Sequence, residues 1–357
     1  MEPYYYQRLS KPMQEAYHAI KRGVESLNPA FPVPRLEMER LSEVLFYLRL
    51  DRPEIFYITN FSCRVHPDAL RVEFCPEYLF DKGRIREHQK ALRARVERLA
   101  RPAQAFTEWE KERYIHDFIC TQVRYDKLKK PYSHEIIGPL GQGVGVCEGI
   151  AKSVKALCDQ LGLWCIVVIS ENAPEKGIKY RHAWNVVRIG GRYYHLDATF
   201  DNSVGTPELI RYDYFNLEDR RIFRDHEPLI TPAPACSEGD GFYYRKKTLL
   251  YQAGRGGAPG GTGCPEEEGA GIPLERRLSY PSSVEGYPSM PGAGRSEPGY
   301  APQSAAQLAS GSAPGGLYAG MPCAYAGCPA GQRRRGAGGT SAPGGNCRGH
   351  IAITRLF

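Results

Sequence analysis

The sequence contains no long apolar run. Its longest uninterrupted one, Leu163 to Ile169, is far shorter than the roughly 20 apolar residues that a membrane-spanning helix needs. The first residues, Met1 to Tyr4, lack the basic start and the apolar centre of a secretory signal. We therefore expect a cytoplasmic protein that associates with no membrane.

Cysteine is sparse, and neither sign of charge dominates. The chain has 11 cysteines among 357 residues, without the regular spacing of a small disulfide-bonded domain. We therefore expect reduced thiols in a reducing compartment. The 47 Lys and Arg residues exceed the 40 Asp and Glu residues too little to predict a nucleic-acid partner. A hydrophobic content of 42% is enough for one or two domains with apolar cores.

Residues 254–357 contain no Lys, Asp or Trp. They hold 24 of the 38 glycines and 12 of the 28 prolines, and the word Ala-Pro-Gly-Gly occurs in them three times. Such a segment cannot bury enough apolar surface to offset the entropy of ordering its backbone, so we predict a disordered tail. Two origins fit this composition, a natural flexible appendage or a shifted reading frame in a GC-rich gene.

The rest of the chain divides into three predicted segments. Residues 1–104 form an N-terminal region of helices and short strands, 105–235 form the core, and 236–253 form its C-terminal extension. A basic helix is expected at 83–101. We interpret its charged residues as a solvated face, and binding of an anionic partner is the weaker alternative.

The first candidate functional residue is Cys147. A glycine-rich turn at 141–146 leads into it, and apolar residues at helical spacing follow it up to Gly162. The helix dipole and the unpaired backbone amides at a helix N-terminus favour thiolate, the nucleophilic form of cysteine. The neighbouring carboxylate of Glu148 opposes this effect unless its side chain points away.

A predicted β-hairpin brings two further candidates together. Gly190-Gly191 is a strong signal for a two-residue turn, and with this turn the numbers of paired residues sum to 381. His182 and Asp197 then lie diagonally on one face of the sheet, with Cβ atoms about 7 Å apart. Asp201 is a second diagonal neighbour of His182, so spacing alone does not choose between the two carboxylates. An imidazole oriented by a carboxylate can take the proton of a thiol and return it to a leaving amine.

At these residues the chain resembles the transglutaminase-like superfamily, which has a papain-like cysteine peptidase core, and its bacterial members in particular. The matching words are Gly-Val-Cys-Glu-Gly-Ile-Ala-Lys at 145–152, Arg-His-Ala-Trp-Asn-Val-Val at 181–187, Tyr-Tyr-His-Leu-Asp-Ala-Thr-Phe-Asp at 193–201 and Tyr-Phe-Asn-Leu at 214–217. The resemblance covers about 107–227. It implies an α+β fold in which the nucleophile helix packs on an antiparallel sheet. It also implies Cys147 as nucleophile, His182 as general base and acid, and Asp197 as the orienting carboxylate.

Three further residues are candidates for supporting roles. Gln142, five residues before the cysteine, is placed like an oxyanion donor of the papain type, although backbone amides of the same turn are alternatives. Trp184 and His195 are candidates for contacts around the catalytic groups, with core packing as the alternative reading for the tryptophan. No metal or cofactor is expected. His134-Glu135 lacks the second histidine of a zinc-protease motif, and the glycines at 141–145 fit no phosphate-binding fingerprint.

The function predicted from these residues is acyl transfer on a peptide or glutamine-type carboxamide through a thioester. With water as acceptor the protein is a peptidase or amidase, and with an amine it is a crosslinking transglutaminase. The expected partner is a protein or peptide substrate. The alternative is a non-catalytic interaction module that retains the fold.

Overall fold

The computed structural model describes residues 2–65, 70–206 and 209–246, and shorter pieces of the chain beyond them. These pieces are 272–273, 280, 287–288, 290 and 350–354. Disorder was predicted for residues 254–357. Apart from these short pieces, those residues lie outside the described part of the chain.

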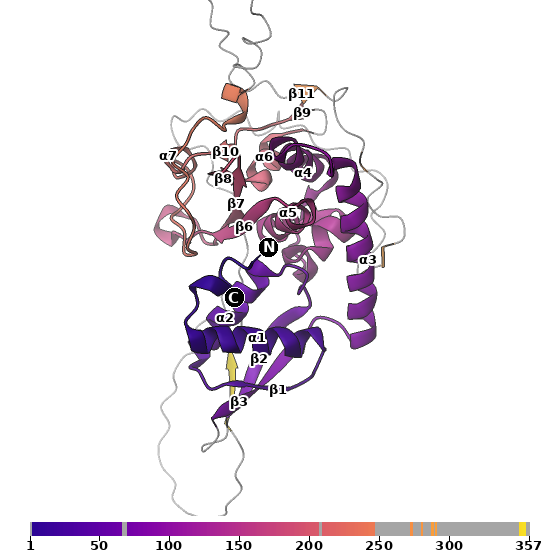
Figure 1. Ribbon diagram of the computed structural model, residues 1–357, viewed down its shortest axis with the longest axis vertical. Helices are drawn as coiled ribbons and strands as arrows, with labels where there is room; N and C mark the ends of the chain where they lie inside the picture. Colours follow the sequence, from indigo (N-terminus) through magenta and orange to yellow (C-terminus); the bar gives the residue numbers. More distant parts are fainter. Residues whose placement is uncertain are drawn as a thin grey trace, which may run out of the picture.

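The N-terminal region combines two helices with an antiparallel sheet (Figure 1). The helical elements are η1 (Tyr6–Arg8), α1 (Lys11–Glu25) and α2 (Met38–Asp51). In spatial order the strands are β1 (Phe31–Pro34), β3 (Arg71–Tyr78), β2 (Ile58–Val65) and β12 (His350–Thr354). Buried side chains alternate with more exposed ones along β2 and β3, as the two-residue period of a strand requires for a sheet with one buried face.

Helix α3 (Lys82–Ala100) runs beside both halves of the described fold and contacts α5 (Figure 1). Its apolar stripe of Ile85, Leu92 and Leu99 is buried, as helical spacing predicts. Most of its basic residues are solvated, but Arg95 is only 2% exposed and lies over the ring of Phe118. The prediction of a wholly solvated basic face was therefore wrong at Arg95, because this position falls on the side of α3 that meets the core.

The core is a four-stranded antiparallel sheet with α5 (Cys147–Leu161) packed on it. In spatial order its strands are β10 (Phe215–Leu217), β8 (Arg192–Leu196), β7 (Ala183–Ile189) and β6 (Trp164–Ile169). This mixture of helix and antiparallel sheet is the predicted fold class. The predicted limits at residues 104 and 235 stay predictions.

The hairpin of β7 and β8 has the predicted register. Asn185 pairs with Leu196 and Val186 with His195, so the paired numbers sum to 381. Gly190 has a φ of 58°, a conformation that glycine adopts with little strain and that this turn type requires. The register places His182 and Asp197 at the open end of the hairpin, next to the first turn of α5.

The remaining elements surround this core. They are η2 (Arg101–Ala103), α4 (Glu108–Gln122), β4 (Arg124–Tyr125), η3 (Pro131–His134), the π-helical turn η4 (Ile137–Gln142), β5 (Val144–Gly145), η5 (Pro174–Lys176), α6 (Ala198–Val204), β9 (Leu209–Ile210), α7 (Asp219–Ile222) and β11 (Ile272–Pro273). Helix α4 begins with a capping box, in which Thr107 and Glu110 exchange hydrogen bonds. Among the described residues, no helix combines the length and apolar character needed to cross a membrane.

Candidate active site

Close backbone contact fixes the start of the cysteine helix. Cys147 is the first residue of α5, and the amide of Val146 before it donates a hydrogen bond of 3.0 Å to the carbonyl oxygen of Ser133. A Cβ atom on Gly149 would lie 2.2 Å from that same oxygen. Only glycine fits there, so the motif word Cys-Glu-Gly lets the first turn of α5 press against η3.

The first turn of α5 is also tied to the sheet. Cys147 is 3% exposed. It belongs to an apolar cluster with Tyr5, Leu50, Ala151, Val167, Ile169 and Ala183. Asn185 in β7 donates a hydrogen bond of 2.9 Å from Nδ2 to the carbonyl oxygen of Ala151. Because β7 begins one residue after His182, this contact holds the cysteine turn beside the segment that carries the histidine.

The oxidation state of Cys147 differs from that of the other described cysteines. Six are free, namely Cys63, Cys75, Cys120, Cys158, Cys165 and Cys236. Cys147 is disulfide-bonded in the structure, which departs from the expectation of reduced thiols. Since the thiolate is the nucleophilic form of cysteine, Cys147 can react as a nucleophile only after reduction.

The carboxylate of Glu148 is neutralised by a buried cation. Lys152 places Nζ 2.8 Å from Glu148 Oε1 and 3.0 Å from both carboxylate oxygens of Glu135. Arg49 of α2 makes a further ion pair with Glu135. Burial alone would raise the pKa of Glu148, but Lys152, then His134 and Arg49, hold this pKa well below its usual range. The side chain of Glu148 is therefore directed to other partners. Its charge then no longer opposes formation of the Cys147 thiolate, as the sequence requires of a nucleophilic Cys147.

His182 and Asp197 meet as the hairpin register requires. The two side chains are joined by a hydrogen bond of 2.6 Å between His182 Nε2 and Asp197 Oδ2. Asp197 Oδ1 accepts the backbone amides of Thr199 and Phe200, which makes Asp197 the N-cap of α6. Burial raises the pKa of Asp197, but His182 and His226 together hold it well below its ordinary value. The fully buried carboxylate is thus ionised and oriented.

Asp201, the other carboxylate that spacing allowed, has a different partner. Its Oδ2 lies 3.0 Å from His116 Nε2, and its Oδ1 accepts the backbone amide of Tyr214. Burial, opposed by His116, raises the pKa of Asp201 to about 6. Asp201 is one turn into α6, so its side chain points into the space between α6 and α4. The geometry therefore joins Asp197, and not Asp201, to His182.

Sequence reasoning missed His226. Its Nε2 lies 2.8 Å from Asp197 Oδ2, the same oxygen that His182 contacts, and its Nδ1 lies 2.8 Å from Asp225 Oδ1. His226 follows α7 in an irregular segment beyond the last motif word, so neither strand spacing nor helical spacing marks it. The only available signal was its position beside an acidic residue at the end of the matching region.

Trp184 and His195 form a hydrogen-bonded pair behind the candidate base. The indole ring of Trp184 stacks on His182 with ring centroids 5.6 Å apart. Its Nε1 donates a hydrogen bond of 2.9 Å to His195 Nδ1, and His195 Nε2 lies 2.8 Å from Asp219 Oδ1. Because an indole only donates, His195 Nδ1 must accept, and Nε2 carries the ring proton. Burial, opposed by Asp219, lowers the pKa of His195 and favours this neutral form.

Gln142 ends the π-helical turn η4 ahead of the cysteine. Its amide nitrogen donates a hydrogen bond of 3.2 Å to the carbonyl oxygen of Pro288. The next residue, Gly143, has a φ of 64° and reverses the chain toward β5. The oxyanion role of Gln142 stays a prediction.

Among the described residues, two clusters present side chains of the types that bind metals. One is His182, Asp197 and His226, and the other is His195, Asp219 and Cys236; in each, the possible ligand atoms lie within 4.8 Å of one another. In the first, both histidine Nε2 atoms lie at hydrogen-bond distance from one oxygen of the ionised Asp197, so each donates a hydrogen bond to it. In the second, the Trp184 hydrogen bond to His195 Nδ1 leaves Nε2 as the protonated nitrogen, and Nε2 donates to Asp219. Both arrangements fit hydrogen-bond networks.

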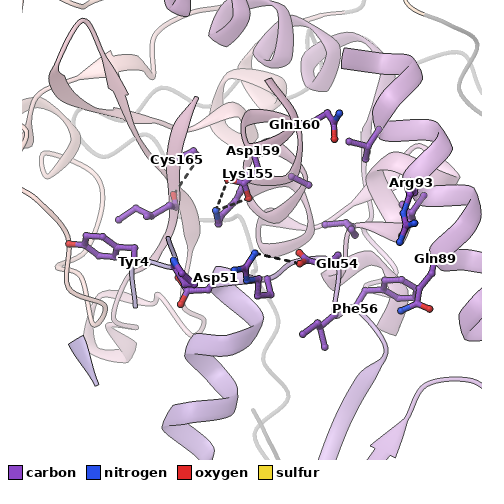
Figure 2. A pocket seen from close by; sticks show the side chains of 18 of the residues that line it. Tyr4, Asp51, Glu54, Phe56, Gln89, Arg93, Lys155, Asp159, Gln160 and Cys165 are labelled. Atoms are coloured by element: carbon purple, nitrogen blue, oxygen red, sulfur yellow. Dashed lines mark hydrogen bonds and ion pairs between the residues drawn. The ribbon is translucent and has the colours of Figure 1, made fainter. Parts of the chain in front are cut away.

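The described residues also form a cavity of about 660 Å³ between the N-terminal region and the core, away from the candidate active site. Figure 2 shows Asp51, Glu54 and Arg93 around it, with Lys155 of α5 reaching toward Asp159. Neither Cys147 nor the His182–Asp197 pair lines this space. The cavity is therefore separate from the candidate active site.

Comparison with known proteins identifies the region around the site. Residues 93–198 match the model of the Transglutaminase-like superfamily. This match contains the cysteine, histidine and aspartate described above, and it confirms the resemblance seen in the sequence. The chain therefore contains a transglutaminase-like domain. No curated protein is significantly similar to it in sequence.

Two solved structures are similar over part of the fold. One is a TGase, at 13% identity and a TM-score of 0.28, covering 48% of this chain and 50% of the other. The second is a Cytophaga hutchinsonii protein designated a cysteine protease, at 16% identity and a TM-score of 0.23, covering 36% of this chain and 51% of the other. The similarity thus spans about half the length of each of the two solved structures.

Proposed function

We propose that the transglutaminase-like domain of this chain transfers acyl groups from a carboxamide through a thioester on Cys147. The observation that carries this proposal is the 2.6 Å hydrogen bond between His182 and the buried carboxylate of Asp197, placed beside the first turn of the cysteine helix. A base oriented by a carboxylate next to a thiol at a helix N-terminus is the arrangement that nucleophilic acyl transfer requires. The family match supports the same chemistry.

The proposed reaction has two stages. His182 takes the proton of the reduced Cys147 thiol, and the sulfur attacks the carbonyl carbon of the carboxamide. The tetrahedral intermediate collapses when the C–N bond breaks, and His182 gives its proton to the leaving amine. The resulting thioester is then attacked by water or by a second amine, which His182 deprotonates, and Cys147 leaves as the thiol.

In the proposed reaction the two ring nitrogens of His182 have different tasks. Nε2 donates to Asp197, so it is held as the protonated nitrogen. Nδ1, on the other side of the ring, is then the nitrogen that exchanges a proton with Cys147. The stacked ring of Trp184 and the ring of Phe200, whose centroids lie 5.6 Å and 4.8 Å from that of His182, limit rotation of the imidazole. The orientation of His182 is thus set by one charged contact and two aromatic ones.

We propose a protein or peptide as the substrate, because a peptide and a glutamine side chain both present the required carboxamide. Water as acceptor makes the domain a peptidase or amidase, and a lysine amine makes it a crosslinking enzyme. Which acceptor attacks the thioester depends on how much water reaches the site while it is occupied. Incubation of a labelled glutamine peptide with and without a primary amine separates the two reactions by the mass of the product.

The proposal is tested by alkylation of the reduced full-length chain with limiting iodoacetamide between pH 5 and 9. Site-by-site mass spectrometry compares Cys147 with the free Cys75, Cys158 and Cys165. We expect Cys147 to react at least tenfold faster than Cys75 at pH 6 to 7, and His182→Ala to remove the difference. Equal rates for Cys147 and Cys75 in the folded protein would contradict the proposal and favour a non-catalytic interaction module.

A further inference from the structure

His226 is a buried histidine held between two carboxylates at the candidate site. Its side chain is 1% exposed, with Nε2 2.8 Å from Asp197 Oδ2 and Nδ1 2.8 Å from Asp225 Oδ1. Asp225 Oδ2 also accepts a hydrogen bond of 2.6 Å from the hydroxyl of Tyr214. Every polar atom of the His226 ring therefore has a specific acidic partner.

These contacts determine where the protons of His226 lie. Asp197 is ionised and can only accept, so His226 Nε2 carries a proton. Asp225 Oδ1, whose companion oxygen Oδ2 already accepts the Tyr214 hydroxyl, likewise accepts from Nδ1. The ring is then an imidazolium. Burial lowers the pKa of His226, but the hydrogen bonds and charges of Asp197 and Asp225 outweigh burial and raise it.

The same carboxylate oxygen serves His182. Asp197 Oδ2 lies 2.6 Å from His182 Nε2, and the centroids of the two imidazole rings are 5.3 Å apart. A positive charge on His226 therefore opposes a positive charge on His182 and shares the carboxylate that would stabilise it. The other groups around His226 are the neutral rings of Trp184 and Phe200. The more distant His195, on β8, is kept neutral by its own partners.

We infer that His226 is a positioning residue that balances the charge of Asp197 and so makes the His182 imidazolium a readier proton donor. This inference rests on the proposed acyl transfer, in which His182 must return its proton to the leaving amine. An Asp197 that served His182 alone would hold that proton more tightly. Asp197, shared between the two histidines, thus keeps the His182 ring oriented through Nε2. The proton on Nδ1 can still be transferred to the leaving amine.

The test measures ring protonation in the reduced full-length chain labelled with ¹⁵N-histidine, by NMR across pH 4.5 to 9.5. We expect both ring nitrogens of His226 to be protonated at pH 7. In His226→Gln the amide can still donate to Asp197 but carries no charge. The titration midpoint of the His182 ring should then rise by about one pH unit, as the loss of one nearby charge predicts.

Alkylation of Cys147 gives a second readout of the same variant. The upper break in the pH profile of the Cys147 alkylation rate, where the thiolate loses its imidazolium partner, should rise with the His182 midpoint. Asp225→Asn removes the outer partner of His226, and it should shift both quantities in the same direction by a smaller amount. Asp225 is partly exposed, so this variant decides the question if His226→Gln does not fold. His18→Gln, on the exposed side of α1, is the matched control and should shift neither quantity.

The outcomes separate the two proposals. A neutral His226 ring at pH 7, or a folded His226→Gln in which the His182 midpoint is unchanged, would overturn the inference. A lower alkylation rate with unmoved pH limits also overturns it, because that result indicates a purely structural role. If wild-type Cys147 reacts no faster than Cys75 while the His182 midpoint still shifts, the acyl-transfer proposal fails and the role of His226 stands.

Discussion

Replacement of Lys152 by methionine should strongly destabilise the protein, because Lys152 is the fully buried cation of a network of ion pairs. Its Nζ contacts Glu148 at 2.8 Å and Glu135 at 3.0 Å. In Lys152→Met, the two buried carboxylates keep only Arg49, which pairs with Glu135, and His134, 3.5 Å from Glu148. Removing one partner of a buried ion pair typically costs about 3–5 kcal/mol, since the remaining charge is left uncompensated. We expect the free energy of unfolding to fall by an amount in this range.

Urea unfolding followed by far-UV circular dichroism at pH 7 measures the change. With a slope of about 2–3 kcal/mol per molar urea, the midpoint should fall by roughly 1 to 2 M. Lys176→Met is the matched control, because Lys176 forms an ion pair with Glu227 while remaining 60% exposed. Exposed pairs contribute about 0–1 kcal/mol. Equal midpoints for the two variants would refute the assignment of the network as a buried structural unit.

The same variant tests the electrostatics next to the thiol. Without Lys152, the negative charge of Glu148 acts directly on the adjacent Cys147 and disfavours thiolate, so alkylation should slow about tenfold, the equivalent of about 1.4 kcal/mol. Adding Glu148→Gln to Lys152→Met removes that charge and should restore the rate. If the double variant stays slow although it is folded, the network does not act on Cys147 through charge.

Two further predictions concern other buried carboxyl groups. Asp197→Asn should abolish the fast alkylation of Cys147. Asp201→Asn should leave that alkylation fast and lower the urea midpoint of unfolding. The reverse pattern would show that Asp201, and not Asp197, orients His182. Glu112 is fully buried against Asn216, and burial, opposed mainly by the hydrogen bond from Asn216, raises its pKa to about 8. A raised acid pKa means that the folded state binds the extra proton, so stability is lost as pH rises from the ordinary range toward 8. Glu112→Gln should therefore be more stable than wild type at pH 8 by up to about 5 kcal/mol and equal to it near pH 4, and urea midpoints at the two pH values measure this.

Local sequence information was sufficient for the elements of the site. Helical spacing after Cys147, the Gly190-Gly191 turn and the two-residue period of β7 and β8 follow from backbone geometry within about 20 residues. The register alone brings His182 to the same face as Asp197. The fold class was implied by the resemblance to the transglutaminase-like superfamily, and the structure and the family match confirm it.

The arrangement of charges depended on the tertiary structure. The i,i+4 spacing of Glu148 and Lys152 allows their ion pair locally. The burial of Lys152 and its second contact with Glu135, which also pairs with Arg49 of the N-terminal region, depend on distant segments. The choice between Asp197 and Asp201 depends on how α6 packs against α4, and His226 reaches the site only through the path of the chain after α7. The sequence by itself thus determined which secondary structures form and which residues share a strand face. Long-range packing decided which buried charges meet, because a buried charge is stable only beside partners that distant segments supply.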